Sequence, residues 1–215
     1  MLITQQFVFI HLPKTGGEFL REVCAEQFQD SLVEHAVHKH AGGGQVPAAY
    51  ATLPRFALIR NPWDWYVSWF HYLKSYPFSY PVWRQVSNDG TNDFKTTVAN
   101  LCSGRVERSD PKLAQRLRER DVGLLTIHYD DMARGSVRSG LAMVGKSESL
   151  AEDFLRFLAR HDIAYPSGLE TALAEAPAIN QSRHGPYQAY YDDDLRQLVA
   201  FKDRMIIEAY GYVFE

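Results

Sequence analysis

The sequence of 215 residues is short of cysteine, with Cys24 and Cys102 as its two thiols, and it has no long run of apolar residues. Neither a CxxC pair nor the ligand spacing of a metal site occurs, so the cysteines predict no metal and fit a reducing compartment. No apolar stretch approaches the roughly 20 residues that cross a bilayer. The start, MLITQQFVFIHL, is too short and too polar for a secretory signal. We therefore expect a cytoplasmic protein without a membrane span.

A strong charge of either sign is also missing. Lys and Arg number 23 against 26 Asp and Glu, for a formal net charge of −3. This balance gives no global basic field, so we expect neither nucleic acid nor an anionic membrane as a partner. The length and the hydrophobic content of 46% suit one full core, and we expect residues 1–215 to form a single domain.

A strand, a glycine-bearing loop and a helix follow one another between residues 7 and 28. The apolar run FVFI at residues 7–10 predicts a buried parallel strand, and apolar spacing predicts a helix over residues 18–28. Between them lies the loop Pro13-Lys14-Thr15-Gly16-Gly17. Its glycines let the backbone approach an anion, the helix N-terminus favours negative charge, and Lys14 adds a mobile full charge. The stretch predicts a phosphate-binding loop, with an ordinary glycine turn as the alternative.

The loop lacks the Walker A spacing, because Lys14 precedes the glycines and no glycine lies upstream of it in the loop. A nucleotide triphosphatase is therefore disfavoured. A kinase-like phosphotransferase stays open and would take its magnesium ligands from the acidic pair Asp130-Asp131, after a predicted strand at residues 123–129. A non-catalytic nucleotide-binding module is the other alternative.

A second candidate anion site follows another predicted strand, at residues 56–59. Arg60 stands at the carboxyl end of this strand, where open parallel sheets bind ligands. Asn61 is a candidate N-cap with Pro62 at the first helical position, so a helix begins at once and places Ser68 about two turns into it. The Arg60 guanidinium and the Ser68 hydroxyl can converge on one anion.

The other predicted elements alternate along the chain. Strands are expected at residues 32–37 and 141–146, and helices at 93–102, 112–120, 150–160 and 192–209; Ser149 and Glu152 have the spacing of a capping box. The alternation predicts an α/β domain with a central parallel sheet flanked by helices. Three histidines at residues 35–40 come without a carboxylate or cysteine at a usual ligand spacing, so no metal is expected there either.

The two anion motifs together resemble sulfotransferases that use 3′-phosphoadenosine 5′-phosphosulfate (PAPS), in particular the carbohydrate and heparan sulfate branch with its bacterial relatives. That family carries Pro-Lys-Thr-Gly-Gly-Thr after its first strand, which stands here as PKTGGE at residues 13–18. Its Arg-Asn-Pro-Trp-Asp motif followed by Val-Ser stands here as RNPWDWYVS at residues 60–68. Glu18 replaces the family threonine, and we expect its side chain to turn outward as a first-turn acid that complements the helix dipole.

The resemblance implies a P-loop NTPase-like sulfotransferase fold and a bacterial-type enzyme, because the Golgi members have a membrane anchor. It implies that residues 13–17 hold the 5′-phosphosulfate of PAPS, with Lys14 also catalytic, and that Arg60 and Ser68 hold the 3′-phosphate. A histidine of the family deprotonates the acceptor hydroxyl, and the His-Ala pattern points to His40, with His38 as the reserve candidate.

Two further features come from the same resemblance. The family has an Asn-x-Ser segment with a basic residue that closes over the nucleotide, which makes Ser182 and Arg183 candidate ligands. The segment at residues 146–150 is similar to the family's Arg-x-Glu-x-Leu and implies a supporting role for Glu148. The acceptor implied is a hydroxyl compound, possibly a saccharide, and no metal is needed.

Overall fold

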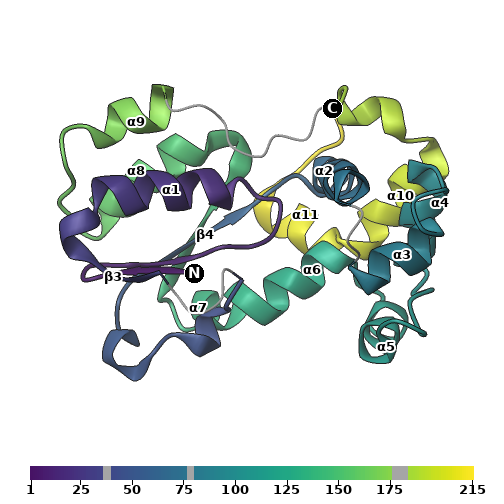
Figure 1. The fold of residues 1–215 in the computed structure, drawn as a ribbon, viewed down its shortest axis with the longest axis horizontal. Helices are drawn as coiled ribbons and strands as arrows, with labels where there is room; N and C mark the ends of the chain where they lie inside the picture. The colour runs from purple at the N-terminus through teal and green to yellow at the C-terminus, as the bar shows by residue number, and fades with distance from the viewer. Residues whose placement is uncertain (36–39, 77–79, 176–183) are drawn as a thin grey trace. The chain divides into compact units, whose positions relative to one another are not determined.

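A mixed sheet forms the central layer of the part of the chain made of residues 1–60 and 128–181 (Figure 1). The computed structural model describes residues 1–35, 40–76, 80–175 and 184–215, and of residues 34 and 35 it describes the backbone. In these residues five strands run in the order β3-β1-β2-β4-β5. Their bounds are β1 Leu2–Thr4, β2 Val8–Ile10, β3 Leu32–His35, β4 Arg55–Ile59 and β5 Ala142–Lys146. The predicted α/β class with a helix-flanked central sheet is confirmed.

The sheet differs from the prediction in being only partly parallel. Strands β2, β4 and β5 are parallel, with Ile10 opposite Ala57 and Ile59 opposite Lys146, whereas β1 pairs antiparallel with both β2 and β3. The cause lies in a tight turn at Thr4. Its hydroxyl donates to the Phe7 carbonyl (3.0 Å) and accepts from the Phe7 N–H (2.9 Å), so the chain reverses at once. A connection this short can join only antiparallel strands.

The chain divides into two compact units. The first contains residues 1–60 and 128–181, and the second contains residues 61–127 and 182–215. In the first unit, helices α1 and α8 lie on one side of the sheet and α7 on the other (Figure 1). The bounds there are α1 Gly17–Gln27, α7 Gly135–Arg138, α8 Leu150–Arg160 and α9 Leu169–Glu175. Short 3-10 turns occur at Gln29–Ser31, Gly43–Gln45, Ala48–Tyr50 and Ser147–Ser149.

The core of the first unit is aromatic. Phe7 and Phe9 from the strand β2 region, Phe56 from β4, and Phe154 and Phe157 from α8 are all completely buried. The ring centroids of Phe56 and Phe154 lie 5.2 Å apart, so the sheet and α8 are joined by direct ring contact. Aromatic side chains bury the largest areas of any residue type and stabilise a layer contact accordingly. This packing fixes the carboxyl ends of β2 and β4 beneath the candidate site.

The second unit is built from helices. Their bounds are α2 Pro62–Ser75, α3 Pro81–Ser87, α4 Phe94–Cys102, α5 Pro111–Glu119, α10 Asp193–Lys202 and α11 Arg204–Tyr210, with a 3-10 turn at Tyr187–Tyr190. Helix α6, Leu124–Tyr129, contains the boundary between the units and runs into a π-helical turn at Asp130–Arg134. The predicted helices 93–102, 112–120 and 150–160 are confirmed within one residue at either end by α4, α5 and α8.

The predicted strand at residues 123–129 is wrong, because this stretch forms α6. Helices need partners for the N–H groups of their first turn, and these partners come here from distant residues. The Asp203 carboxylate accepts from the Thr126 N–H (2.9 Å), and the Tyr66 hydroxyl oxygen accepts from the Leu124 N–H (3.0 Å). Asp203 also interrupts the predicted helix 192–209, which forms α10 and α11 on either side of it.

Asp203 is the centre of a buried polar cluster in the second unit. Besides the Thr126 N–H, its carboxylate accepts from the Thr126 hydroxyl (2.7 Å) and the Tyr66 hydroxyl (2.9 Å). Desolvation raises the pKa of Asp203 above its ordinary value, while these hydrogen bonds act in the opposite direction. Buried polar groups cost free energy unless they are satisfied, and this cluster satisfies them internally.

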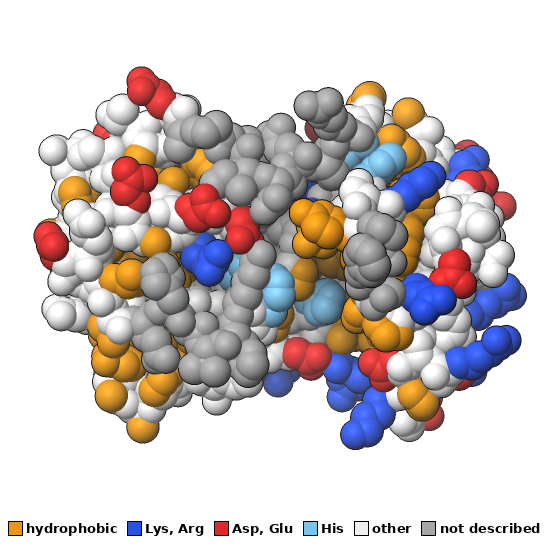
Figure 2. Space-filling model, viewed as in Figure 1, with side chains coloured by type: hydrophobic (Ala, Val, Ile, Leu, Met, Phe, Trp, Pro, Cys, Tyr) orange, Lys and Arg blue, Asp and Glu red, His pale blue; other side chains and the backbone are white. Residues whose placement is uncertain are grey.

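Helix α5 buries its apolar side and leaves a basic side in solvent, as expected for so charged a helix. Leu113 and Leu117 are buried, and the Arg118 guanidinium pairs with Glu107 at 2.7 Å. Figure 2 shows blue side chains gathered at the lower right of the view, where Figure 1 places α5. None of the described helices has the length and apolar character of a membrane span.

Candidate anion-binding site

The loop between β2 and α1 has an unusual backbone. Lys14 has φ 62° and Gly16 has φ 78°, both in the left-handed region. Left-handed residues of this kind occur in nests, where successive N–H groups of the backbone face one anion. Gly16 adopts this φ freely, whereas a lysine adopts it at a cost of about 1 kcal/mol or more. Such a cost persists only where the surrounding structure imposes the conformation.

Thr15 holds the loop together from inside. It is completely buried, and its hydroxyl donates to the Leu12 carbonyl at 2.9 Å. The hydroxyl proton is thus used in a hydrogen bond within this segment. A contribution of Thr15 to anion binding would therefore come through its backbone N–H.

Gly17 is the first residue of α1, and the His11 ring leaves no room for a side chain there. A β-carbon at position 17 would overlap the His11 imidazole, which is itself buried. The absence of a side chain lets the first turn of the helix approach the end of β2 closely. Glu18 lies in this first turn as predicted, and its carboxylate pairs with Arg21 at 3.0 Å. The pairing with a cation reduces the repulsion that Glu18 would exert on a bound anion.

Arg60 meets this loop at the carboxyl edge of the sheet. Strands β2 and β4 are parallel neighbours, so their following residues lie at the same edge. The Arg60 Nη1 donates to the Lys14 carbonyl at 3.4 Å, a long hydrogen bond, and both side chains are half-buried. The structure thus brings the Arg60 guanidinium to the backbone of the Lys14 loop, which joins the two segments that the sequence predicted from separate motifs.

His40 lies beside the same loop. Its Nδ1 is 3.1 Å from the His11 carbonyl oxygen, and the two imidazole centroids are 4.8 Å apart. Because a carbonyl only accepts hydrogen bonds, Nδ1 carries the proton and Nε2 is the basic nitrogen of the neutral ring. His40 is exposed, so a substrate can reach it. The reserve candidate His38 lies outside the described residues.

A buried arginine anchors the segment that follows His40. The Arg55 Nη1 donates to the Gly43 carbonyl (2.9 Å) and to the Ser136 hydroxyl (2.6 Å), and its Nη2 donates to the Ala51 carbonyl (2.9 Å). Burial lowers the pKa of this guanidinium from its ordinary value. The Gly43 carbonyl, three residues after His40, is therefore held by the first residue of β4, whose guanidinium also binds Ser136 of α7.

Of the three remaining predicted ligands, one belongs to the second unit and two lie outside the described residues. Ser68 is buried on α2 in the second unit, and the predicted cap of α2 is confirmed, because the Asn61 Oδ1 accepts from the Trp63 N–H at 3.1 Å. Ser182 and Arg183 lie outside the described residues. The roles of these three residues stay predictions.

Sequence reasoning missed Ser147, which follows β5 at the same edge of the sheet. Its hydroxyl lies 2.7 Å from the Thr15 carbonyl oxygen and 3.0 Å from the Ile59 carbonyl oxygen. No motif identifies such a residue, because its partners are backbone atoms far away in the sequence. The resemblance at residues 146–150 pointed instead to Glu148, which is exposed.

The acidic pair of the kinase alternative does not follow a strand. Asp130 and Asp131 lie in the π-helical turn after α6, and the Asp130 carboxylate pairs with Arg134 at 2.9 Å. In the part of the chain that the structure describes, no group of three or more His, Cys, Asp and Glu side chains is arranged to hold a metal ion. The residues that follow β2 and β4 instead include two cations, Lys14 in the loop and Arg60, whose guanidinium binds the Lys14 carbonyl.

Comparisons with known proteins identify the fold. No protein-family model and no curated protein sequence matches the chain. Among solved structures, the chain is similar to mouse sulfotransferase SULT7A1 complexed with PAP, with a TM-score of 0.55 and 14% sequence identity. The match covers 97% of this chain and 89% of that chain. The predicted sulfotransferase fold is thus confirmed at the level of architecture.

Proposed function

We propose that this protein is a sulfotransferase that transfers a sulfuryl group from PAPS to an acceptor hydroxyl. The observation that carries the proposal is the contact of Arg60 with the Lys14 loop, at the carboxyl edge of a sheet with the sulfotransferase fold. Two cations and a helix N-terminus within one small region suit a ligand with several anionic groups. PAPS is such a ligand, with a phosphosulfate at one end and a 3′-phosphate at the other.

In this proposal the donor is bound at two places. Residues 13–17 hold the 5′-phosphosulfate through backbone N–H groups and the Lys14 ammonium. Arg60 and Ser68 hold the 3′-phosphate and select PAPS over ATP, and Ser182 and Arg183 close over the nucleotide. The half-buried position of Lys14 and Arg60 supports these roles, because partial burial strengthens the attraction between a cation and a phosphate.

The reaction begins with His40. Its Nε2 takes the proton of the acceptor hydroxyl, and the acceptor oxygen attacks the sulfur in line with the bond to the 5′-phosphate. As that bond breaks, negative charge builds on the departing phosphate, and Lys14 with the loop N–H groups stabilises it. A single preorganised donor of this kind contributes about 3 kcal/mol to the transition state. The products are the sulfated acceptor, adenosine 3′,5′-bisphosphate (PAP) and the proton on His40.

A metal is not required by this chemistry. The transferred sulfuryl group carries less charge than a phosphoryl group, and fixed cations already hold the leaving nucleotide. The proposed acceptor is a saccharide or glycoconjugate in the cytoplasm. This choice rests on the resemblance of residues 13–18 and 60–68 to the carbohydrate branch of a bacterial-type enzyme.

Nucleotide binding tests the proposal. Isothermal titration with PAP should give saturable binding, whereas ATP with Mg²⁺ should bind far more weakly because it lacks a 3′-phosphate. The Arg60→Ala variant should lose most of the PAP affinity, and Lys112→Ala, on the exposed side of α5, should bind normally. Equal affinity for ATP and PAP would favour the kinase-like alternative. Tight PAP binding with no turnover over a broad set of acceptors would favour a non-catalytic module.

A further inference from the structure

The 3-10 turn after β5, Ser147–Ser149, joins the two anion-binding segments of the first unit. The Ser147 hydroxyl lies within hydrogen-bond distance of the Thr15 carbonyl, in the Lys14 loop, and of the Ile59 carbonyl, next to Arg60. A hydroxyl has one proton, so the two carbonyl oxygens share a single donor.

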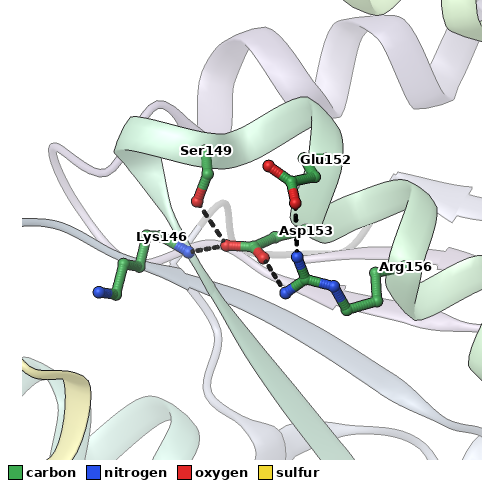
Figure 3. A network of polar contacts seen from close by, with 5 residues as sticks. All are labelled: Lys146, Ser149, Glu152, Asp153 and Arg156. Atoms are coloured by element: carbon green, nitrogen blue, oxygen red, sulfur yellow. Dashed lines mark hydrogen bonds and ion pairs between the residues drawn. The ribbon is translucent and has the colours of Figure 1, made fainter.

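The Ser147–Ser149 turn is held by a network of polar contacts centred on the Asp153 carboxylate (Figure 3). One oxygen of the Asp153 carboxylate accepts from the Lys146 N–H (2.8 Å) and from the Ser149 hydroxyl (2.8 Å). Its other oxygen accepts from Arg156 at 2.8 Å, and Arg156 also binds Glu152. The Asp153 side chain is only 9% exposed, so these bonds are shielded from water. The predicted capping box is therefore wrong, because Ser149 binds the Asp153 side chain instead of capping the backbone.

The strained backbone of the loop explains why such a support is needed. Lys14 keeps a left-handed φ of 62°, which an isolated loop would relax. The two carbonyls that follow this strained bond are both held, Lys14 by Arg60 and Thr15 by Ser147. Carbonyl oxygens fixed toward the ends of β4 and β5 also fix the peptide planes of the loop, and with them the direction of the N–H groups.

We propose that Ser147 is a positioning residue for the donor nucleotide, which locks the Lys14 loop to the strand end that carries Arg60. This inference rests on the proposed function, because the nucleotide whose binding it improves is PAPS. Ser147 touches no reacting atom in this scheme. It acts by keeping the two anion-binding segments at a fixed separation before the ligand arrives, so less ordering is needed on binding.

Replacement of the hydroxyl tests the inference. In Ser147→Ala the two carbonyls lose their shared donor, and we expect the Kd for PAP, measured by isothermal titration, to rise about tenfold. The KM for the acceptor should stay unchanged, and Ser147→Thr, which keeps a hydroxyl, should restore most of the affinity. The matched control is Ser139→Ala, which also removes a hydroxyl bound to a backbone carbonyl of the same unit (Ser136, 3.0 Å) and should leave the Kd unchanged.

Two further measurements sharpen the test. Hydrogen exchange of the amides at residues 13–17 should become faster in ligand-free Ser147→Ala but not in Ser139→Ala. The Ser147→Ala and Arg60→Ala effects on PAP affinity should be non-additive, because both act on one loop. Asp153→Ala should weaken PAP binding in the same way, and Glu152→Gln, at the exposed end of the network, should not.

The outcomes separate this inference from the proposed function. If the wild-type protein fails to bind PAP, the proposed function is wrong, while the exchange experiment still reports on the lock. If the wild type binds PAP and Ser147→Ala binds it equally well with unchanged loop exchange, Ser147 is not a positioning residue and the proposed function stands. Faster exchange together with a higher Kd supports both.

Discussion

Two polar regions of this molecule differ in how far they are buried. The cluster around Asp203 in the second unit is completely buried, and its carboxylate accepts three hydrogen bonds from Tyr66 and Thr126. The Lys14 loop of the first unit combines a strained backbone with half-buried cations and the exposed His40. The first arrangement satisfies its polar groups internally and serves stability. The second keeps charge within reach of solvent and is the proposed binding site.

The largest effect should follow from Asp203→Ala. This change leaves the Tyr66 hydroxyl and the Thr126 N–H without their buried acceptor, and the free energy of unfolding should fall by about 3–5 kcal/mol. Urea unfolding followed by tryptophan fluorescence measures it. Asp194→Ala, an exposed acid on the same helix α10, should change stability by no more than about 0.5 kcal/mol. A loss below about 1 kcal/mol for Asp203→Ala would contradict a structural role for the cluster.

Lys14→Ala should lower the activity strongly and leave the free energy of unfolding nearly unchanged. Because the ammonium is proposed to stabilise charge in the transition state, kcat should fall by about 10²-fold or more. The free energy of unfolding should change by less than about 1 kcal/mol, since the Lys14 side chain is only half-buried. Steady-state kinetics and urea unfolding on the same preparation give both numbers. A stability loss as large as that of Asp203→Ala would remove the distinction between the two regions.

Gly17→Ala should affect both properties to a moderate degree. The added methyl group overlaps the buried His11 ring, and overpacking of this kind costs about 1–3 kcal/mol. The shift of His11 should also disturb His40, whose Nδ1 binds the His11 carbonyl. We expect a lower melting temperature together with a reduced rate. Gly44→Ala, where an added β-carbon meets nothing, is the control and should match the wild type.

The smallest effect should appear in the pH dependence of stability. Burial raises the pKa of Asp203 in the folded protein, so at a pH between the unfolded and the folded pKa the folded state holds a proton that the unfolded state has released. The contribution of this group to stability is therefore fully present below the unfolded pKa and is lost as the pH rises through the folded pKa. Urea unfolding from pH 4 upward should show this decline in the wild type and not in Asp203→Asn. Equal slopes for the two proteins would refute it.

The sequence predicted the elements whose signals are local. The loop at residues 13–17, the Asn61 cap and helix α8 each depend on residues within a few positions of one another, and the structure agrees with them. Helix α6 was mistaken for a strand because its N–H partners are Tyr66 and Asp203, which lie 58 and 77 residues from the groups they bind.

The same reason explains the other differences. The antiparallel strand β1 depends on a hydroxyl turn at Thr4 that periodicity does not reveal. The role of Ser149 depends on Asp153, which competes with the backbone for its hydroxyl. Ser147 binds carbonyls that any residue type would supply, so only the folded chain identifies it. Signals between residues close in the sequence can be read from it, whereas hydrogen bonds between distant residues cannot.

The left-handed conformation of Lys14 has a consequence for how this protein can change. Glycine would fit that φ without strain, so a lysine-to-glycine exchange should cost the fold little or nothing. Selection for thermal stability alone would therefore not retain lysine at position 14. Screening random variants of residue 14 for heat resistance should retain glycine, and screening the same pool for turnover should eliminate it.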